Sequence, residues 1–111
     1  MQTILAYPHS FIIRLSGSLN AANASEFQQQ VATAVQKEWQ KTVLVDMEQV
    51  ESLDSAGLMA LVYGLRLAQA LNLRFGLCAV SPSIRIIFEL TQLDRVFEMF
   101  ENQDAFEAAL V

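Results

Sequence analysis

The sequence is poor in the residues that form disulfides and metal centres, with one cysteine and one histidine among 111 residues. Cys78 has no intramolecular disulfide partner, and its apolar neighbours in residues 77–80 predict packing inside a strand. His9 lies between two strand-like segments, where we expect a solvated turn residue. A metal cluster with His/Cys spacing is therefore absent, and we expect no metal and no cofactor.

Long apolar runs and clusters of basic residues are also missing. The longest mainly apolar run, residues 58–65, is far shorter than the ~20 residues that a membrane-spanning helix needs, and Arg66 follows it at once. Residues 1–5 lack the positive charges and the cleavage site of a secretory signal, so we expect a cytoplasmic protein without a membrane segment. Because the net charge is -5 and the basic residues are scattered, nucleic-acid binding is not expected.

Recognised nucleotide and hydrolase motifs are absent as well. None of the four glycines belongs to a Gly-x-Gly-x-x-Gly run or a Walker-type loop. The segment Leu53-Asp54-Ser55-Ala56-Gly57 keeps only the trailing glycine of the Gly-x-Ser-x-Gly nucleophile elbow. We therefore expect that the protein is not an enzyme. A minor hydrolase that uses Ser55 and His9 stays open, and retained activity after His9→Ala would exclude it.

The chain has the size and the 53% hydrophobic content of one folded domain, so we expect a single domain over residues 1–111. Strand-like segments 3–7 and 11–15 flank the turn-forming cluster of residues 8–10 and predict a hairpin. Apolar residues then recur at helical spacing from Ala24 to Ala34, after a capping-box-like Asn23-x-x-Glu26.

Strands and helices alternate after this hairpin. The apolar run of residues 43–45 predicts a strand that is central in the sheet and buried on both faces. A helix follows from Ser55 onward, with Leu58, Leu61, Val62, Leu65 and Ala68 on its apolar face. The remaining expected elements are a strand at 75–80, a helix that Ser81 caps with Pro82 at its first position, a strand at 96–100 and a helix from about Asn102, in which Phe106, Ala109 and Leu110 share a face.

This alternation predicts an α/β fold: a small, mixed, mostly parallel sheet with interspersed helices and an N-terminal hairpin. Ser55 then follows the carboxyl end of the central strand, where open α/β sheets present their binding sites. The amides of Ala56, Gly57 and Leu58 are expected to point out of the helix start and to favour a phosphate there, with Gly57 leaving room for close approach. Spacing alone, however, favours the simpler interpretation that Ser55 is an N-cap.

Four carboxylates, Asp46, Glu48, Glu51 and Asp54, surround this segment of the sequence. Paired acids can hold magnesium or transfer protons, but such residues more often end strands and cap helices. Asp54 immediately before a helix is expected to act as a cap. A phosphate on Ser55 adds ~1.5–2 negative charges to this acidic loop, so we expect it to repel an acidic partner surface.

Three parts of the sequence resemble the signature of the STAS family: residues 43–47, Val50 and the segment Leu53-Asp54-Ser55-Ala56-Gly57-Leu58. Bacterial anti-sigma factor antagonists carry this signature. The similarity extends over nearly the whole chain, through Gly17-Ser18-Leu19, residues 81–84 and residues 93–97. It implies the STAS-like fold, and it implies that Ser55 is phosphorylated by a serine kinase that is also the anti-sigma factor and dephosphorylated by a serine phosphatase.

The resemblance also implies a docking surface for that partner, on the loop and on the outer face of the helix from Ser55. Two positions depart from many phosphorylated members: Asn20 replaces an acidic residue, and Ala56 replaces a second serine. We expect a cytoplasmic phosphoprotein of signal transduction and transcription regulation, monomeric alone. The alternative is a small-ligand sensor or scaffold subunit that uses the same loop end to hold an anion or nucleotide without phosphorylation. The expected partner-binding residues are Asn20, Asp54, Ser55, Ala56, Gly57, Met59, Tyr63 and Arg66.

Overall fold

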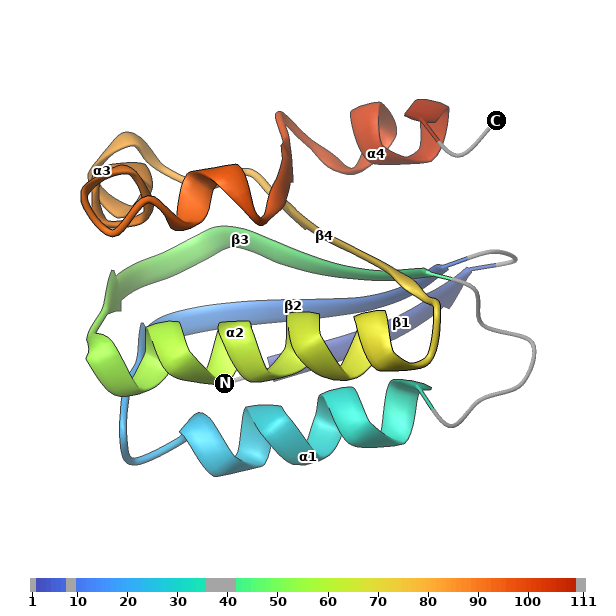
Figure 1. Cartoon of the computed structure of the whole chain (residues 1–111), viewed down its shortest axis with the longest axis horizontal. Helices are drawn as coiled ribbons and strands as arrows, with labels where there is room; N and C mark the ends of the chain where they lie inside the picture. Colours follow the sequence, from blue (N-terminus) through green and yellow to red (C-terminus); the bar gives the residue numbers. More distant parts are fainter. Residues whose placement is uncertain (1, 8–9, 36–41, 110–111) are drawn as a thin grey trace.

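The computed structural model describes residues 2–7, 10–35 and 42–109, and its elements alternate as the sequence predicts (Figure 1). The elements are β1 (Gln2–Tyr7), β2 (Ser10–Leu19), α1 (Ala24–Val35), β3 (Thr42–Leu53), α2 (Ser55–Ala70), β4 (Arg74–Cys78), α3 (Pro82–Leu90), a 3-10 turn (Leu93–Arg95), β5 (Glu98–Phe100) and α4 (Gln103–Ala109). None of the helices in these ranges is long and apolar enough to cross a membrane.

The strands form one sheet in the order β1-β2-β3-β4-β5. β1 pairs antiparallel with β2, and the next three pairings are parallel, so β3 is the central strand. Parallel neighbours need a crossover connection, and α1, α2 and α3 lie in those connections. The expected mixed, mostly parallel sheet with an N-terminal hairpin is therefore confirmed. Pro8 and His9 lie outside the described residues.

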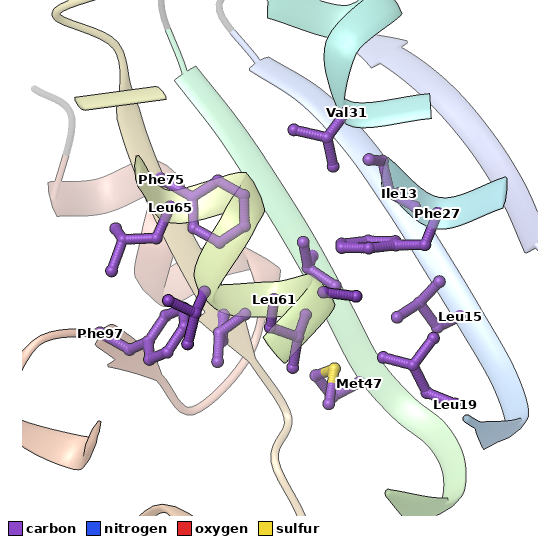
Figure 2. Packing of buried hydrophobic residues seen from close by; sticks show 14 of the residues in the cluster. Ile13, Leu15, Leu19, Phe27, Val31, Met47, Leu61, Leu65, Phe75 and Phe97 are labelled. Atoms are coloured by element: carbon purple, nitrogen blue, oxygen red, sulfur yellow. The ribbon is translucent and has the colours of Figure 1, made fainter. Parts of the chain in front are cut away.

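The main core lies between the sheet and helices α1 and α2, which run side by side under it (Figure 1). Alternate residues of the strands point into it, and the helices contribute side chains at three- and four-residue spacing. Figure 2 shows Ile13, Leu15 and Leu19 of β2 facing Phe27 of α1, with Met47 of β3 beside Leu61 of α2. Phe27, Val31, Ala34, Leu61 and Ala68 are completely buried, as their spacing predicts.

A smaller core covers the opposite face of the sheet. It contains Ile12, Leu44, Cys78 and Phe106, with Phe100 packed against it. Phe106 comes from α4, and its ring meets that of Phe100 edge-on at 5.2 Å between centroids. The predicted last helix is thus present, although Ala109 is exposed and Leu110 lies outside the described residues. β3 is consequently buried on both faces at residues 43–45, as expected.

Several boundaries differ from those expected. β2 and β3 extend to Leu19 and Leu53, because their parallel pairing continues through two register shifts. β4 ends at Cys78, since Ala79 has a positive φ of 56°. β5 begins only at Glu98. The amides of Val96 and Phe97 instead bond to the Leu93 carbonyl in the preceding turn.

The sequence predicts a polar side-chain cap at the starts of α3 and α1, and the structure has the first of these. Ser81 caps α3 by accepting from the Ile84 amide at 3.4 Å, with Pro82 at the first position, as predicted. The capping box expected at Asn23 is wrong. Asn23 Oδ1 accepts from the Asn20 amide at 2.9 Å, and its side-chain amide donates to the Ser18 carbonyl at 2.7 Å, so this side chain faces back toward β2.

Candidate functional site

The candidate site begins at the junction of β3 and α2, where Asp54 is the only residue between the two elements. Asp54 has extended backbone angles, and its Oδ1 accepts from the Gly57 amide at 2.9 Å. A carboxylate there satisfies a free amide and interacts favourably with the helix dipole. Asp54 is therefore the N-cap, as expected. Ser55 is the first helical residue, which removes the simpler interpretation of Ser55 as the cap.

The Ser55 side chain is exposed, and its hydroxyl forms no hydrogen bond with any residue that the structure describes. Because Asp54 already caps the helix, α2 does not need the Ser55 hydroxyl for its own stability. An exposed hydroxyl at the first position of a helix is accessible to a second protein. It also lies where the helix dipole favours a negative group.

The start of α2 has fewer unpaired backbone amides than the sequence predicts. The Gly57 amide donates to Asp54 Oδ1, and the Leu58 amide donates to the Asp54 carbonyl at 2.9 Å. The expectation of three unpaired amides at residues 56–58 is thus wrong for two of them. Within the described part of the chain, the amides of Ser55 and Ala56 are those left without a protein acceptor in the first turn.

The packing of the fold itself requires a residue without a side chain at position 57. A Cβ at this position would lie 2.2 Å from the carbonyl oxygen of Leu19 and 2.9 Å from Leu53 Cδ1. The start of α2 therefore packs directly against the backbone at the end of β2. The expectation that Gly57 leaves room for a phosphate is wrong, because the Leu19 backbone occupies that side.

The same contact brings Asn20 to the site. Leu19 pairs with Leu53 in the parallel ladder, and the Asp54 amide donates to the Leu19 carbonyl at 3.3 Å. Asn20 and Asp54 directly follow these paired residues at one edge of the sheet. Asn20 is partly buried, and its Oδ1 accepts from the Ala22 amide at 2.9 Å, which stabilises the turn that leads into α1.

A hydrogen bond between two serines holds the strand ends together and was not predicted. Ser52 Oγ donates to Ser18 Oγ at 2.6 Å, and these residues are direct partners in the β2–β3 register. Ser18 and Ser52 are separated by 34 positions. No local pattern relates them, and only the strand register could have identified the pair.

The outer face of α2 carries one continuous stripe from Ser55 to Arg66. Residues 55, 59, 63 and 66 recur every three or four positions and so lie on one side of the helix, over about 16 Å. Met59 is 57% exposed and Tyr63 is 42% exposed, and Arg66 is also exposed. With Val62 and Leu67 they line a shallow groove. Met59 and Tyr63 are therefore surface residues.

The four acidic residues do not form one cluster. Glu51 is exposed on β3 near its end, but Asp46 and Glu48 line a cleft of about 450 Å³ on the sheet face that α4 covers. Arg14 Nε donates to Asp46 Oδ2 at 3.2 Å there, and Arg14 Nη2 donates to Gln103 Oε1 at 3.2 Å. Among the described residues, no group of three or more His, Cys, Asp or Glu side chains is placed to bind a metal.

Cys78 is buried in the wall of this cleft, at 1% exposure. Burial raises the pKa of the Cys78 thiol to about 12, and the nearby Asp46 carboxylate acts in the same direction. Such a thiol stays protonated at neutral pH and is a poor nucleophile. The predicted packing role is confirmed. A hydrolytic pair of Ser55 with His9 remains untested, since His9 lies outside the described residues.

Comparison with known proteins shows the family. The STAS domain model matches residues 3–105, and the chain therefore belongs to the STAS domain family. BtrV of Bordetella bronchiseptica, named for a proposed role as an anti-sigma factor antagonist, is 26% identical over 95 residues, which are 86% of this chain and 81% of BtrV.

Solved structures show the same fold. A Thermotoga maritima protein with the same proposed role has a TM-score of 0.87 at 23% identity, covering 96% of this chain and 92% of that structure. SpoIIAA of Bacillus in its phosphorylated form has a TM-score of 0.75 at 20% identity, covering 98% of this chain and 99% of that structure. The family that the sequence resembles and the fold that this resemblance implies are both confirmed.

Proposed function

We propose that this STAS protein is a cytoplasmic protein–protein switch of the anti-sigma factor antagonist type, with Ser55 as its phosphate acceptor. The unmodified protein binds an anti-sigma factor that is also a serine kinase, and the phosphorylated protein releases it. A serine phosphatase restores the binding form. The protein itself is a binding protein and not an enzyme. The observation that carries this proposal is the position of the exposed Ser55 hydroxyl at one end of the exposed stripe on α2.

The stripe offers the partner a suitable contact surface. Methionine and tyrosine provide large, adaptable apolar area, and both are favoured in protein interfaces. Met59 and Tyr63 lie about 6 and 12 Å along the helix axis from Ser55. A partner that covers them therefore also approaches the Ser55 hydroxyl. Asn20 and Asp54 lie at the same end of the surface and would contact the partner there, together with the adjoining helix start at Ala56 and Gly57.

Phosphorylation at Ser55 should change binding without unfolding the protein. The kinase transfers a phosphoryl group from a nucleoside triphosphate: the O–P bond forms at Ser55 Oγ, the nucleoside diphosphate leaves, and the hydroxyl proton passes to a base of the kinase. The helix dipole and the free amides of Ser55 and Ala56 stabilise the product within this chain. The phosphatase restores the hydroxyl by hydrolysing the ester with water.

The same phosphate is unfavourable for a bound partner. It adds ~1.5–2 negative charges beside the Asp54 carboxylate and near the exposed Glu51. Arg66, the basic residue of the stripe, is about 16 Å away along the helix axis and cannot neutralise it. An acidic or apolar partner surface packed over Ser55 would then be repelled or would bury an unpaired charge. The chain therefore keeps its fold while the complex dissociates.

The first test is intact-mass and fragment mass spectrometry on protein purified from its own cells. We expect an added phosphate on Ser55 in part of the population and none on Ser25, an exposed serine of α1 that serves as the internal control. Absence of phosphate from Ser55 under varied growth conditions would contradict covalent switching.

The second test measures binding of the kinase captured from those cells. Ser55→Ala should bind constitutively, and Ser55→Asp should bind at least about tenfold more weakly, which corresponds to 1.4 kcal/mol. Ser25→Ala and Ser25→Asp are the matched controls and should both bind like the wild type. Equal affinity of the two Ser55 variants would refute the switch.

One observation favours a small-ligand sensor or scaffold subunit, although at a site other than the Ser55 loop end that the sequence suggests. The cleft on the α4 face has the size of a ligand site, but its carboxylates, Asp46, Glu48 and Asp104, outnumber its one guanidinium, that of Arg14. Its charge favours a neutral or cationic ligand over a nucleotide. Saturable binding of a small molecule that Ser55→Ala leaves unchanged and Arg14→Met removes would support this alternative, whereas loss of binding only in Ser55→Ala would exclude it.

A further inference from the structure

The exposed surface of α3 carries two large apolar side chains, in contrast to that of α1 over residues 24–34. Ile86 is 51% exposed and Leu90 is 80% exposed, and the four-residue spacing places them on one side of the helix. Over residues 24–34 of α1, the exposed residues are instead polar: Ser25, Glu26, Gln29 and Thr33. Contacts inside the protein use Ile84 and Phe88, which are buried. The outer face of α3 is thus a second apolar surface, on a different element from the Ser55 stripe.

Charged residues flank this face with the same four-residue spacing. Arg85 and Glu89 are both exposed, and neither forms an ion pair with a residue that the structure describes. At 100° per residue they lie together along one flank of the Ile86–Leu90 pair. One flank therefore presents a positive charge and a negative charge, about 6 Å apart along the axis.

This arrangement is complementary to itself. In a two-fold contact, when one residue of the first copy meets a given residue of the second copy, the reverse pair of residues meets as well. When two α3 helices pack antiparallel with Ile86 opposite Leu90 of the second copy, the charged flanks also meet. Arg85 then lies about 3 Å along the axis from Glu89 of the second copy, within reach of its long side chain, and the pair occurs twice.

We infer that a second copy of this chain binds the Ile86–Leu90 face through an antiparallel, two-fold contact between α3 helices. The area limits the strength of this contact. A stable interface buries about 800 Å² on each partner, far more than two apolar side chains and their flanking charges can supply. The dimer is therefore weak, with a dissociation constant on the order of 0.1–1 mM. Dilute protein is therefore monomeric, and the dimer forms only at high concentration.

Sedimentation equilibrium of the whole chain at increasing concentration, up to about 1 mM, tests this inference. The wild type should show reversible monomer–dimer behaviour. The double variant Ile86→Gln, Leu90→Gln should raise the dissociation constant at least about tenfold, because it removes the apolar contact and keeps good helix formers. Leu71→Gln changes a comparably exposed apolar residue outside both surfaces, at 50% exposure, and should leave self-association unchanged. A wild type that stays monomeric at the highest concentration would overturn the inference.

Exchange of the two charges separates a second copy from any other occupant. Arg85→Glu alone or Glu89→Arg alone creates two like-charge pairs and should weaken the dimer about fivefold. The combined exchange restores both pairs and should return the dissociation constant to within about twofold of the wild type. Circular dichroism checks that each variant keeps its helix content. Single variants without effect, or a combined exchange that does not restore the dimer, would refute the two-fold geometry.

Discussion

Gly57 at the start of α2 packs against the carbonyl group of Leu19 at the end of β2, so closely that a Cβ would lie 2.2 Å from the carbonyl oxygen. Leu19 is itself paired with Leu53, the residue before the Asp54 cap. Two strand ends and one helix start thus meet at a single backbone contact. This contact sets the position of the Ser55 hydroxyl relative to Asn20, and it explains why the smallest residue is needed at position 57.

Substitution Gly57→Ala should lower the free energy of unfolding by about 2–3 kcal/mol, because the added methyl group meets backbone that cannot move alone. Gly64→Ala in the same helix is the matched control. Its Cβ would lie 3.2 Å from the Phe75 ring, and the higher helix propensity of alanine offsets that contact, so stability should stay within about 1 kcal/mol of the wild type. Urea unfolding measures both. Equal losses would show that the Leu19 contact has no special role.

Substitution Asp54→Ala should lower the free energy of unfolding by about 1 kcal/mol, since the Gly57 amide loses its acceptor. Asp54→Asn keeps a side-chain oxygen at the cap and should retain most of this stability. The pair of variants also separates folding from partner binding. If Asp54→Asn is stable but binds the partner poorly, the carboxylate charge acts in recognition. A stable Asp54→Ala protein would contradict the capping role.

Cys78 should react slowly with alkylating reagents in the native protein. Its thiol is buried and its pKa is raised to about 12, so little thiolate exists at pH 8. We expect alkylation at least about 100-fold slower in the native protein than in protein unfolded in urea. Mass spectrometry of samples taken over time gives both rates. Comparable rates would show that the cleft opens and exposes the sulfur.

The ion pair between Arg74 and Glu98 should make stability depend on acidic pH. Arg74 Nη2 donates to Glu98 Oε2 at 2.7 Å, and this hydrogen bond lowers the pKa of Glu98. The stabilisation is therefore present above the ordinary carboxyl pKa and is lost as the pH falls through the lowered value. Both groups are partly exposed, so Glu98→Gln should cost at most about 1 kcal/mol at pH 7.

At about pH 3 the difference between Glu98→Gln and the wild type should shrink, because protonation of Glu98 removes the same charge. Urea unfolding at the two pH values measures it. Arg74 is a poor choice for this test, since it also donates to the Ala109 carbonyl and lies over the Phe100 ring. A difference that stays constant between the two pH values would show that the Glu98 charge contributes nothing.

Local sequence patterns determined the elements of this protein and much of its site. Helical spacing identified the buried faces of α1 and α2, and Ser81-Pro82 marked the start of α3, because these signals depend only on neighbouring residues. Alternation of strands and helices was enough for the mixed, mostly parallel sheet. The Asp-Ser-x-Gly-Leu segment pointed to the STAS family and to Ser55.

Only the tertiary structure decided how those parts meet. Three contacts join residues that are more than 30 positions apart: the Leu19–Gly57 contact, the Ser18–Ser52 hydrogen bond and the Arg14–Asp46 pair. No periodicity in the sequence relates these residues. The same holds for the free amides at Ser55 and Ala56, because a capping side chain competes for the amides of the first turn. Local propensity therefore sets which residues form each helix and strand, whereas packing and register set which surfaces remain available for binding.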